Sequence, residues 1–503
     1  MKKNLKKILF SNSKKLVLFF FFIFTNEVCM AKAKVLSAKN IEEQKVLCDQ
    51  VSYSENYEEE VSYESFIEDC KGLVYLLESA YAGYEDMCSK GFNSELFITE
   101  CENRFSDVDV IGVSEIAEFY YSYLINYIND AHCSIQSAYF NKNFLNSKTI
   151  FFSDVYVEDN GGNFFIRKPD NLGIPLNTNI DINEKYLFKY PSEGINVYRI
   201  GKLTDNTTDE VTVTLKVNNK SNELQCKKNN SYINKKYLDD LTRYNEIETE
   251  KTGYISIKTF NDFPKDTLYR KKLDKIYNDF AYAGAKFRNK EFVILDLRGN
   301  GGGNSLHSSK FLNYLITDQE VKSIGNFSSI LLFSPAIYQV LQTQLQTTYS
   351  QKDKTYSIYK KLMGLCKKRK RLQILYDPRN DRKKIKSMFK GKLIIIIDKQ
   401  TASSAELIIA HAKELLDKNN QIILVGENSL GCTNYGNIFS YQLRNSGISF
   451  RLAQFKMENL GITEGVGLIP DYWATNEDLI TALQKITNDE ELEKITNIIN
   501  NNL

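Results

Sequence analysis

Residues 392–436 read KLIIIIDKQTASSAELIIAHAKELLDKNNQIILVGENSLGCTNYG, and this stretch decides the fold. Leu393 to Ile397 are consecutive bulky apolar residues, a pattern typical of a strand that is buried on both faces. A short polar turn follows, and an apolar periodic run through Leu416 then predicts a helix. The sequence therefore predicts a strand, a tight turn and a helix, with Ser403 and Ser404 where the helix begins.

The two serines have two interpretations. The first N–H groups of a helix lack partners within the helix, and the helix dipole is positive there, so a tetrahedral oxyanion formed on a serine would be stabilised. Serine before a helix is also a common capping residue, which accepts a hydrogen bond from the first turn. The neighbouring sequence has to decide between a nucleophile and a cap.

Two further motifs accompany this stretch. Upstream, EFVILDLRGNGGG contains a second buried strand, Phe292 to Leu297, that runs into a glycine-rich turn, and downstream TEGVGLIPD spans Thr463 to Asp471. LDLRGNGGG, TASSAE, VGENSLG and EGVGLIPD, in that order, resemble the tail-specific, or C-terminal-processing, serine protease superfamily. The resemblance covers most of residues 60 to 480. It implies an α/β fold whose catalytic domain is crotonase-like, with a mainly parallel sheet and covering helices.

Composition limits the function classes. The chain has 503 residues, a formal charge of +2 and 42% hydrophobic residues, which describes an ordinary folded protein of two or three domains. Neither a nucleic-acid partner nor intrinsic disorder is expected from these values. Beyond the N-terminal leader, an even number of cysteines remains, which permits disulfide bonds without defining their pairing.

The N-terminus resembles a secretory signal peptide. Lysines precede a nine-residue apolar run, Leu16 to Phe24, and the small residues Ala31 and Ala33 follow it. Such a run is too short to cross a hydrocarbon core of about 30 Å. We expect residues 1–33 to be removed and the mature chain to be exported, periplasmic or secreted, without stable membrane insertion. An uncleaved anchor is the alternative.

Changes in the hydrophobic pattern along the chain predict three regions after the leader. Residues 34–145 are mostly helical, and residues 146–245 form a small β-rich unit that resembles a PDZ-like module, which would receive an extended peptide on a sheet edge. Residues 246–503 form the catalytic α/β domain, with a basic helical insertion at about 335–390. The charge run Lys367 to Arg371 in this insertion is either a solvated face or a contact for an acidic partner or membrane surface.

A serine nucleophile needs a base, and the sequence offers His132, His307 and His411. His411 lies eight residues after Ser403 on the same helix, about 12 Å away along its axis, and should be out of reach. Asn129-Asp130-Ala131-His132 resembles the motif in which the Ser-His branch of the superfamily keeps its base. The Ser-Lys branch has a lysine in the turn that matches residues 426–432, where this chain has Cys432.

The same resemblance implies the remaining site residues. Glu464, 61 residues after Ser403, is the expected carboxylate that orients the imidazole and raises its pKa; a solvated loop glutamate is the alternative. The Ser404 N–H and the Gly302 N–H are the expected oxyanion donors, with Gly301 as a second choice. Glu406 is expected to serve only the first helical turn.

These observations predict an exported serine endopeptidase that cleaves polypeptides through an acyl-enzyme on Ser403, with a Ser403-His132-Glu464 triad. Neither a metal ion nor an organic cofactor is implied, and Cys432 is not expected to be the nucleophile. The alternative is a catalytically inactive ligand- or peptide-binding protein on the same fold. The sequence does not define the oligomeric state.

Overall fold

A computed structural model describes the chain over residues 48–50, 58–168, 173–205, 208–228, 243–261, 268–317, 327–347, 360, 363–364, 372–376, 387–417, 420–496 and 499. The predicted leader lies outside these residues. The chain divides into two compact units, each built from separated stretches. The first unit comprises Met1–Leu145, Gly325–Lys383 and Cys432–Glu464; the second comprises Asn146–Ile324, Lys384–Gly431 and Gly465–Leu503.

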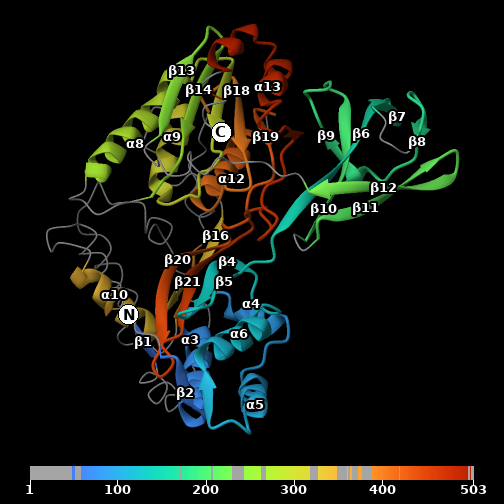
Figure 1. Cartoon of the computed structure of the whole chain (residues 1–503). Helices are drawn as coiled ribbons and strands as arrows, with labels where there is room; N and C mark the ends of the chain where they lie inside the picture. Colours follow the sequence, from blue (N-terminus) through green and yellow to red (C-terminus); the bar gives the residue numbers. More distant parts are fainter. Residues whose placement is uncertain are drawn as a thin grey trace. The chain divides into compact units, whose positions relative to one another are not determined.

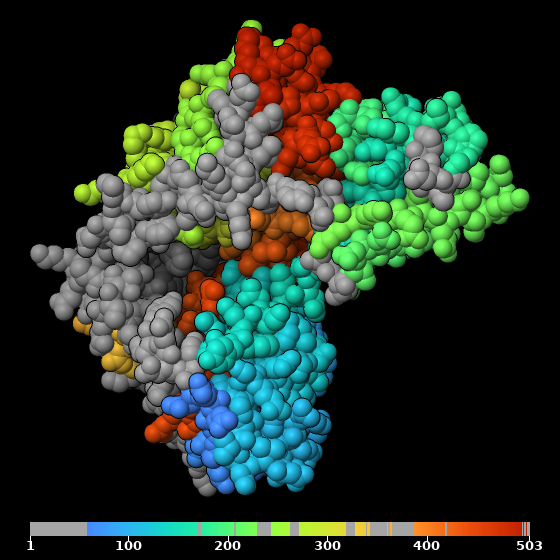
Figure 2. Space-filling view, in the orientation of Figure 1, coloured from blue at the N-terminus to red at the C-terminus, as the bar shows by residue number. Residues whose placement is uncertain are grey.

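Helices dominate the early part of the first unit, as the sequence predicts. Ser62 caps the longest of them, because its side chain accepts a hydrogen bond from the Ser65 N–H at 3.2 Å. Figure 2 shows residues 58–145 as a continuous blue to cyan mass. The elements are β2 (Glu60–Ser62), α3 (Tyr63–Ala80), α4 (Tyr84–Ser89), α5 (Ser94–Arg104), β3 (Val110–Gly112) and α6 (Val113–Leu124).

The first unit also contains a seven-stranded sheet. Its centre is a hairpin around Asn445-Ser446-Gly447, with Tyr441 paired to Phe450. The strands are β1 (Cys48–Gln50), β4 (Asp130–Gln136), β5 (Asn141–Phe144), β16 (Ser328–Phe333), β17 (Leu372–Tyr376), β20 (Tyr435–Leu443) and β21 (Ser449–Glu458). Helix α10 (Pro335–Thr347) follows β16.

This sheet changes the domain organisation inferred from the sequence. Residues 325–383 and 432–464 were expected in the catalytic α/β domain, but they cluster with the N-terminal region. The reason is strand pairing over long sequence separations: β21 pairs with β4, and Phe450 joins the same hydrophobic cluster as the helices. The insertion is also not purely helical, since β17 pairs with β16. Its basic run, Lys367 to Arg371, lies outside the described residues.

The β-rich region of the second unit is a seven-stranded antiparallel sheet, which confirms the β-rich prediction. Apolar and polar residues alternate along its strands, so Val213, Leu215 and Leu224 point into a small core. Its likeness to a PDZ module stays a prediction. The strands are β6 (Lys148–Asn160), β7 (Asn163–Lys168), β8 (Asn179–Ile180), β9 (Leu187–Lys189), β10 (Val197–Asp205), β11 (Glu210–Val217) and β12 (Lys220–Lys228).

A six-stranded sheet carries the motifs that decided the fold, in the order β13-β14-β15-β18-β19-β22. All neighbours except β13 and β14 are parallel, which confirms a mixed α/β class with a mainly parallel sheet. The strands are β13 (Tyr244–Glu248), β14 (Thr252–Ile257), β15 (Phe292–Asp296), β18 (Lys392–Ile397), β19 (Ile422–Gly426) and β22 (Tyr472–Trp473).

Helices cover this sheet, which explains its uninterrupted apolar strands. Ile394 and Ile396 of β18 share a core cluster with Leu479 and Leu483 of α13. Figure 1 shows α8 and α9 alongside the same sheet. The helices are α8 (Leu268–Phe287), α9 (Ser305–Ile316), α12 (Ser404–Leu416), α13 (Leu479–Thr487) and the 3₁₀ helix Glu490–Ile495. Within the described residues, no helix has the length and apolar character needed to cross a membrane.

Candidate active site

Ser403 occupies a strained turn between β18 and α12. Its φ and ψ are 54° and −121°, although only glycine adopts a positive φ at little cost. Backbone strain of this kind, at about 1–3 kcal/mol, persists where surrounding contacts hold it, and it is a feature of nucleophiles on strand-to-helix turns. The Ser403 N–H donates to Glu406 Oε2 at 3.1 Å, which is one of these contacts. Glu406 also completes a capping box with Ser403, so the serine caps α12 in a strained conformation.

Asp398 ties this turn to the glycine-rich turn after β15. Its two carboxylate oxygens each lie 3.0 Å from the Gly299 N–H, and Oδ1 also accepts the Thr401 N–H at 3.0 Å. A backbone hydrogen bond from the Ala402 N–H to the Asn300 carbonyl, 3.0 Å long, joins the same turns. Burial raises the pKa of Asp398, and the backbone donors oppose that rise. The two turns are therefore held as one rigid element.

Gly302 lies directly against the serine turn. Its φ is 93°, and a Cβ placed on it would lie 2.8 Å from Ser403 Cβ and 2.8 Å from the Ser404 nitrogen. Only glycine fits this approach. The structure therefore brings Gly302, Ser403 and Ser404 together, as the sequence predicts. The Gly302 N–H donates to Asn300 Oδ1 at 2.9 Å, so in this conformation it already has an acceptor.

Glu406 has a wider role than the sequence suggests. Its side chain is fully buried, and besides the Ser403 N–H it accepts the Ser429 hydroxyl and, at 2.8 Å, the Gly431 N–H. It therefore connects the serine turn to the turn after β19, in addition to serving the first helical turn. Sequence reasoning missed Ser429, because nothing in VGENSLG marks that serine as a partner of a glutamate more than twenty residues upstream.

A second cluster, in the first unit, contains the predicted base. His132 lies on β4 at a register irregularity, and its Nδ1 and Nε2 lie 3.4 Å and 3.3 Å from Cys432 Sγ. One donor atom each of His132, Cys432 and Glu464 lie within 4.8 Å of one another. Glu464 is 7% exposed, and its oxygens accept the Ala131 and Asn434 N–H groups at 3.2 Å. The alternative of a solvated loop glutamate is therefore wrong.

Asp130 is a second carboxylate beside the imidazole, and sequence reasoning did not assign it a role. Asp130 Oδ1 accepts the His132 backbone N–H at 2.8 Å and lies 3.7 Å from His132 Nδ1. The side chain is completely buried, and burial raises its pKa to about 6. Its position two residues before the histidine was the available signal, since an aspartate commonly bonds the backbone two residues further on.

The pKa of His132 contradicts the sequence-based expectation. Burial, with a smaller contribution from the positive charge of Arg451, lowers it to about 4, although a neighbouring carboxylate was expected to raise it. Both of these effects act in the same direction. The imidazole is consequently neutral at pH 7 and has a lone pair available to accept a proton.

The other histidines have structural surroundings. His411 is 2% exposed within α12, where burial lowers its pKa to about 4. His307 lies in the first turn of α9, and its ring stacks on Tyr277 with the ring centroids 3.8 Å apart. Neither residue belongs to the cluster of His132, Cys432 and Glu464 among the described residues. His132 stays the candidate base because of the motif that surrounds it in the sequence.

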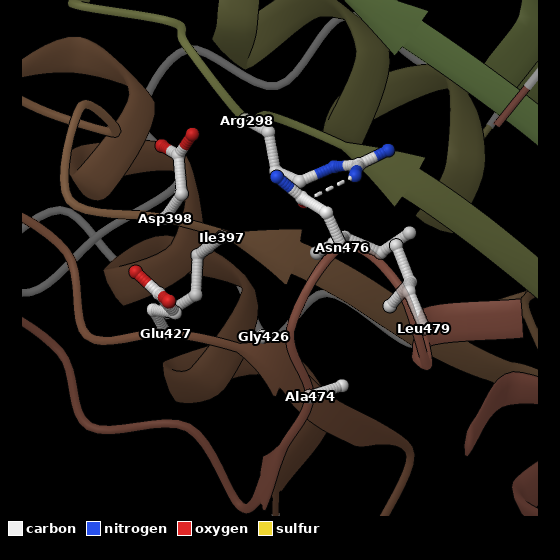
Figure 3. A pocket seen from close by; sticks show the side chains of 9 residues that line it. Arg298, Ile397, Asp398, Gly426, Glu427, Ala474, Asn476 and Leu479 are labelled. Carbon is white, nitrogen blue, oxygen red and sulfur yellow. Dashed lines mark hydrogen bonds between the residues drawn. The ribbon is translucent and has the colours of Figure 1, made fainter. Parts of the chain in front are cut away.

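A small pocket lies at the carboxyl ends of β15, β18 and β19 (Figure 3). Arg298 crosses it and donates to Asn476 Oδ1 at 2.9 Å, and it forms an ion pair with the buried Asp296 at 2.6 Å. Burial alone would raise the pKa of Asp296, but the charge of Arg298 outweighs burial and lowers it. The ion pair holds the LRGN turn in place. Asp398, which also lines this pocket, holds the serine turn.

The predicted residues thus fall into two groups. Ser403, Ser404 and Gly302 belong to the second unit, and His132 and Glu464 belong to the first. Gly431–Cys432 and Glu464–Gly465 are two of the five peptide bonds at which the chain passes from one unit to the other. The catalytic roles of these residues stay predictions.

Residues 251–474 match the model of peptidase family S41. Comparison with curated proteins gave no match. Among solved structures, mature CPAF complexed with lactacystin is 14% identical with a TM-score of 0.41, covering 88% of this chain and 99% of that chain. A putative peptidase from Parabacteroides merdae is 11% identical with a TM-score of 0.38, covering 87% and 97% respectively.

The photosystem II D1 C-terminal processing protease is 11% identical with a TM-score of 0.33, and the match covers 82% of this chain and 92% of that chain. Identities and TM-scores at this level carry no functional argument. The function of the chain is therefore inferred from the family match and from its own residues.

Proposed function

Residues 251–474 of this chain belong to peptidase family S41, and from that premise we propose that the protein is an exported serine endopeptidase with Ser403 as nucleophile. The observation that carries the proposal is the strained conformation of Ser403, with a φ of 54°, against Gly302 and at the start of α12. A serine that only capped the helix would not need this strain, because capping residues ordinarily have extended backbone angles.

In the proposed reaction His132 acts as general base. Ser403 Oγ attacks the carbonyl carbon of the scissile peptide bond while its proton passes to the neutral imidazole. The tetrahedral intermediate then collapses, the C–N bond breaks, and His132 returns the proton to the leaving amine. Water hydrolyses the resulting ester by the same route. Glu464 orients the ring and stabilises its transient positive charge. Asp130 helps to hold His132 in place by accepting its backbone N–H.

The oxyanion is assigned to the N–H groups of Ser404 and Gly302. To donate to the oxyanion, the Gly302 N–H must first give up its 2.9 Å hydrogen bond to Asn300 Oδ1. Loss of this one hydrogen bond costs about 1 kcal/mol. A donor aimed at the oxyanion contributes about 2.7–4 kcal/mol to transition-state stabilisation, so the exchange is favourable.

An active-site serine probe tests the proposal. A fluorophosphonate should label the processed, folded protein at Ser403, as located by peptide mass spectrometry, and Ser403→Ala should remove the label. Absence of labelling in a protein with a cooperative unfolding transition would favour the alternative, a binding protein on the same fold. Labelling at another serine would also refute the assignment.

A further inference from the structure

Three donor atoms of different chemistry meet in the first unit, and only two of them belong to the proposed triad. A thiol, an imidazole and a carboxylate, from Cys432, His132 and Glu464, have donor atoms within 4.8 Å of one another. The thiol has no part in the proposed acyl transfer. Sequence spacing could not reveal this set, because the residues lie 32 to 332 positions apart and form no metal-binding motif.

The distances suit a tetrahedral metal ion. Sulfur at about 2.3 Å and nitrogen at about 2.0 Å from one zinc ion lie roughly 3.5 Å apart, and Cys432 Sγ is 3.3 Å from His132 Nε2. Since Sγ is almost equally far from both ring nitrogens, it does not lie along either lone pair. Coordination therefore requires rotation of the imidazole about its last torsion, which has a broad energy minimum.

The surroundings of the cluster support ligand binding. The Ala131 and Asn434 N–H groups hold the Glu464 carboxylate, and such hydrogen bonds are compatible with metal ligation because a carboxylate oxygen has more than one lone pair. Cys432 and Glu464 are 6% and 7% exposed, whereas the His132 side chain is 16% exposed. The imidazole is therefore the least buried of the three ligands.

We propose that His132, Cys432 and Glu464 bind a Zn²⁺ ion that reversibly inhibits the peptidase. Mixed nitrogen, sulfur and oxygen donors suit Zn²⁺, while Mg²⁺ and Ca²⁺ prefer oxygen alone. Binding converts the Cys432 thiol into a thiolate and releases its proton to solvent. The ion occupies a lone pair of His132, so the base no longer accepts the serine proton. The proposed Zn²⁺ binding does not depend on the proposed function, whereas the proposed inhibition rests on it.

Metal binding is tested first without reference to activity. Titration of the full processed chain with Co²⁺ should produce a thiolate-to-cobalt charge-transfer absorption band, and Zn²⁺ should displace Co²⁺ and remove the band. Cys432→Ser should abolish the band and weaken Zn²⁺ binding, measured by calorimetry, by about 100-fold or more, since loss of even an outer partner costs 10–100-fold. Cys88→Ser, in α4 and outside the cluster, is the matched control and should bind as the wild type does.

Zinc should also raise the midpoint of thermal unfolding of the wild type and of Cys88→Ser, but not of Cys432→Ser, because a ligand stabilises only the state that binds it. Equal Zn²⁺ affinity in wild type and Cys432→Ser would overturn the inference. If Cys432→Ser does not fold, Glu464→Gln provides the second variant, and unchanged affinity there would overturn the inference as well.

Inhibition is then measured as the ratio of rates with and without Zn²⁺ for each variant. For the wild type, this ratio should be one tenth or less at saturating Zn²⁺, and a chelator should restore the rate. For Cys432→Ser, the ratio should stay near one. Binding by a chain that lacks peptidase activity would refute the proposed function and leave the site intact. Peptidase activity with binding that does not depend on Cys432 would refute the site alone.

Discussion

Gly302→Ala should disable the proposed oxyanion hole, and its effect can be worked out from the structure. The added Cβ would lie 2.7 Å from the Ala402 carbonyl oxygen and 2.8 Å from both Ser403 Cβ and the Ser404 nitrogen. These are backbone or rigid atoms, so the two turns must separate. Alanine at a φ of 93° adds a backbone strain of about 1–2 kcal/mol.

Separation of the turns removes the Gly302 donor from the oxyanion. Loss of one such donor costs about 2.7–4 kcal/mol, which predicts a fall in kcat of about 10²–10³-fold. The assay is peptide hydrolysis together with the rate of fluorophosphonate labelling, and urea unfolding reports the change in the free energy of unfolding. Labelling at the wild-type rate by Gly302→Ala would refute the reasoning.

Gly301→Ala is the matched control, since nothing lies within 4 Å of its added Cβ. It makes the same chemical change one residue earlier, and its N–H is kept. We expect activity and stability close to wild type. If Gly301→Ala loses as much activity as Gly302→Ala, the close approach of Gly302 to the serine turn is not what the enzyme needs.

Three further outcomes are expected. Because burial lowers the pKa of His132 to about 4, the base is neutral above that value, and kcat/KM should fall as pH drops through about 4. Burial raises the pKa of Asp130 to about 6, so a small inflection near pH 6 would report Asp130, whereas loss of most of the activity below an inflection near pH 6.5 or higher would contradict a neutral His132. Glu464→Gln should reduce kcat by about 10²–10⁴-fold, because an amide holds the ring but does not stabilise its charge; a loss below tenfold would shift that role to Asp130. N-terminal sequencing of exported protein should begin after Ala31 or Ala33, and an intact Met1 on membrane-bound protein would exclude processing.

Local sequence patterns predicted the elements that bear the site. The apolar run before TASSAE forms β18, and the periodic run after it forms α12. These elements follow from hydrophobic period and turn chemistry within a short window, which is where sequence reasoning is strongest. The choice of Gly302 came from the resemblance of its turn to that of the protease superfamily, and the structure places Gly302 against Ser403.

Features that depend on long-range pairing could not be predicted. Strand β4 joins β21 more than 300 residues later, which moves residues 432–464 out of the unit that contains Ser403. Burial, not a neighbouring carboxylate, determines the direction of the pKa shift of His132, and burial is a property of the folded chain. The hydrogen bond from the Gly302 N–H to Asn300 Oδ1 likewise depends on a side-chain conformation that no sequence motif predicts.

The central claim is that Ser403 and His132 act together in one acylation step, and a double-mutant cycle on kcat/KM tests it most directly. Ser403→Ala, His132→Ala and the double variant should each lose a similar rate, on the order of 10⁴–10⁶-fold, because removal of either residue ends the same acylation step. Losses that add would mean that the residues act separately. Wild-type-like hydrolysis by a folded His132→Ala protein would contradict the mechanism.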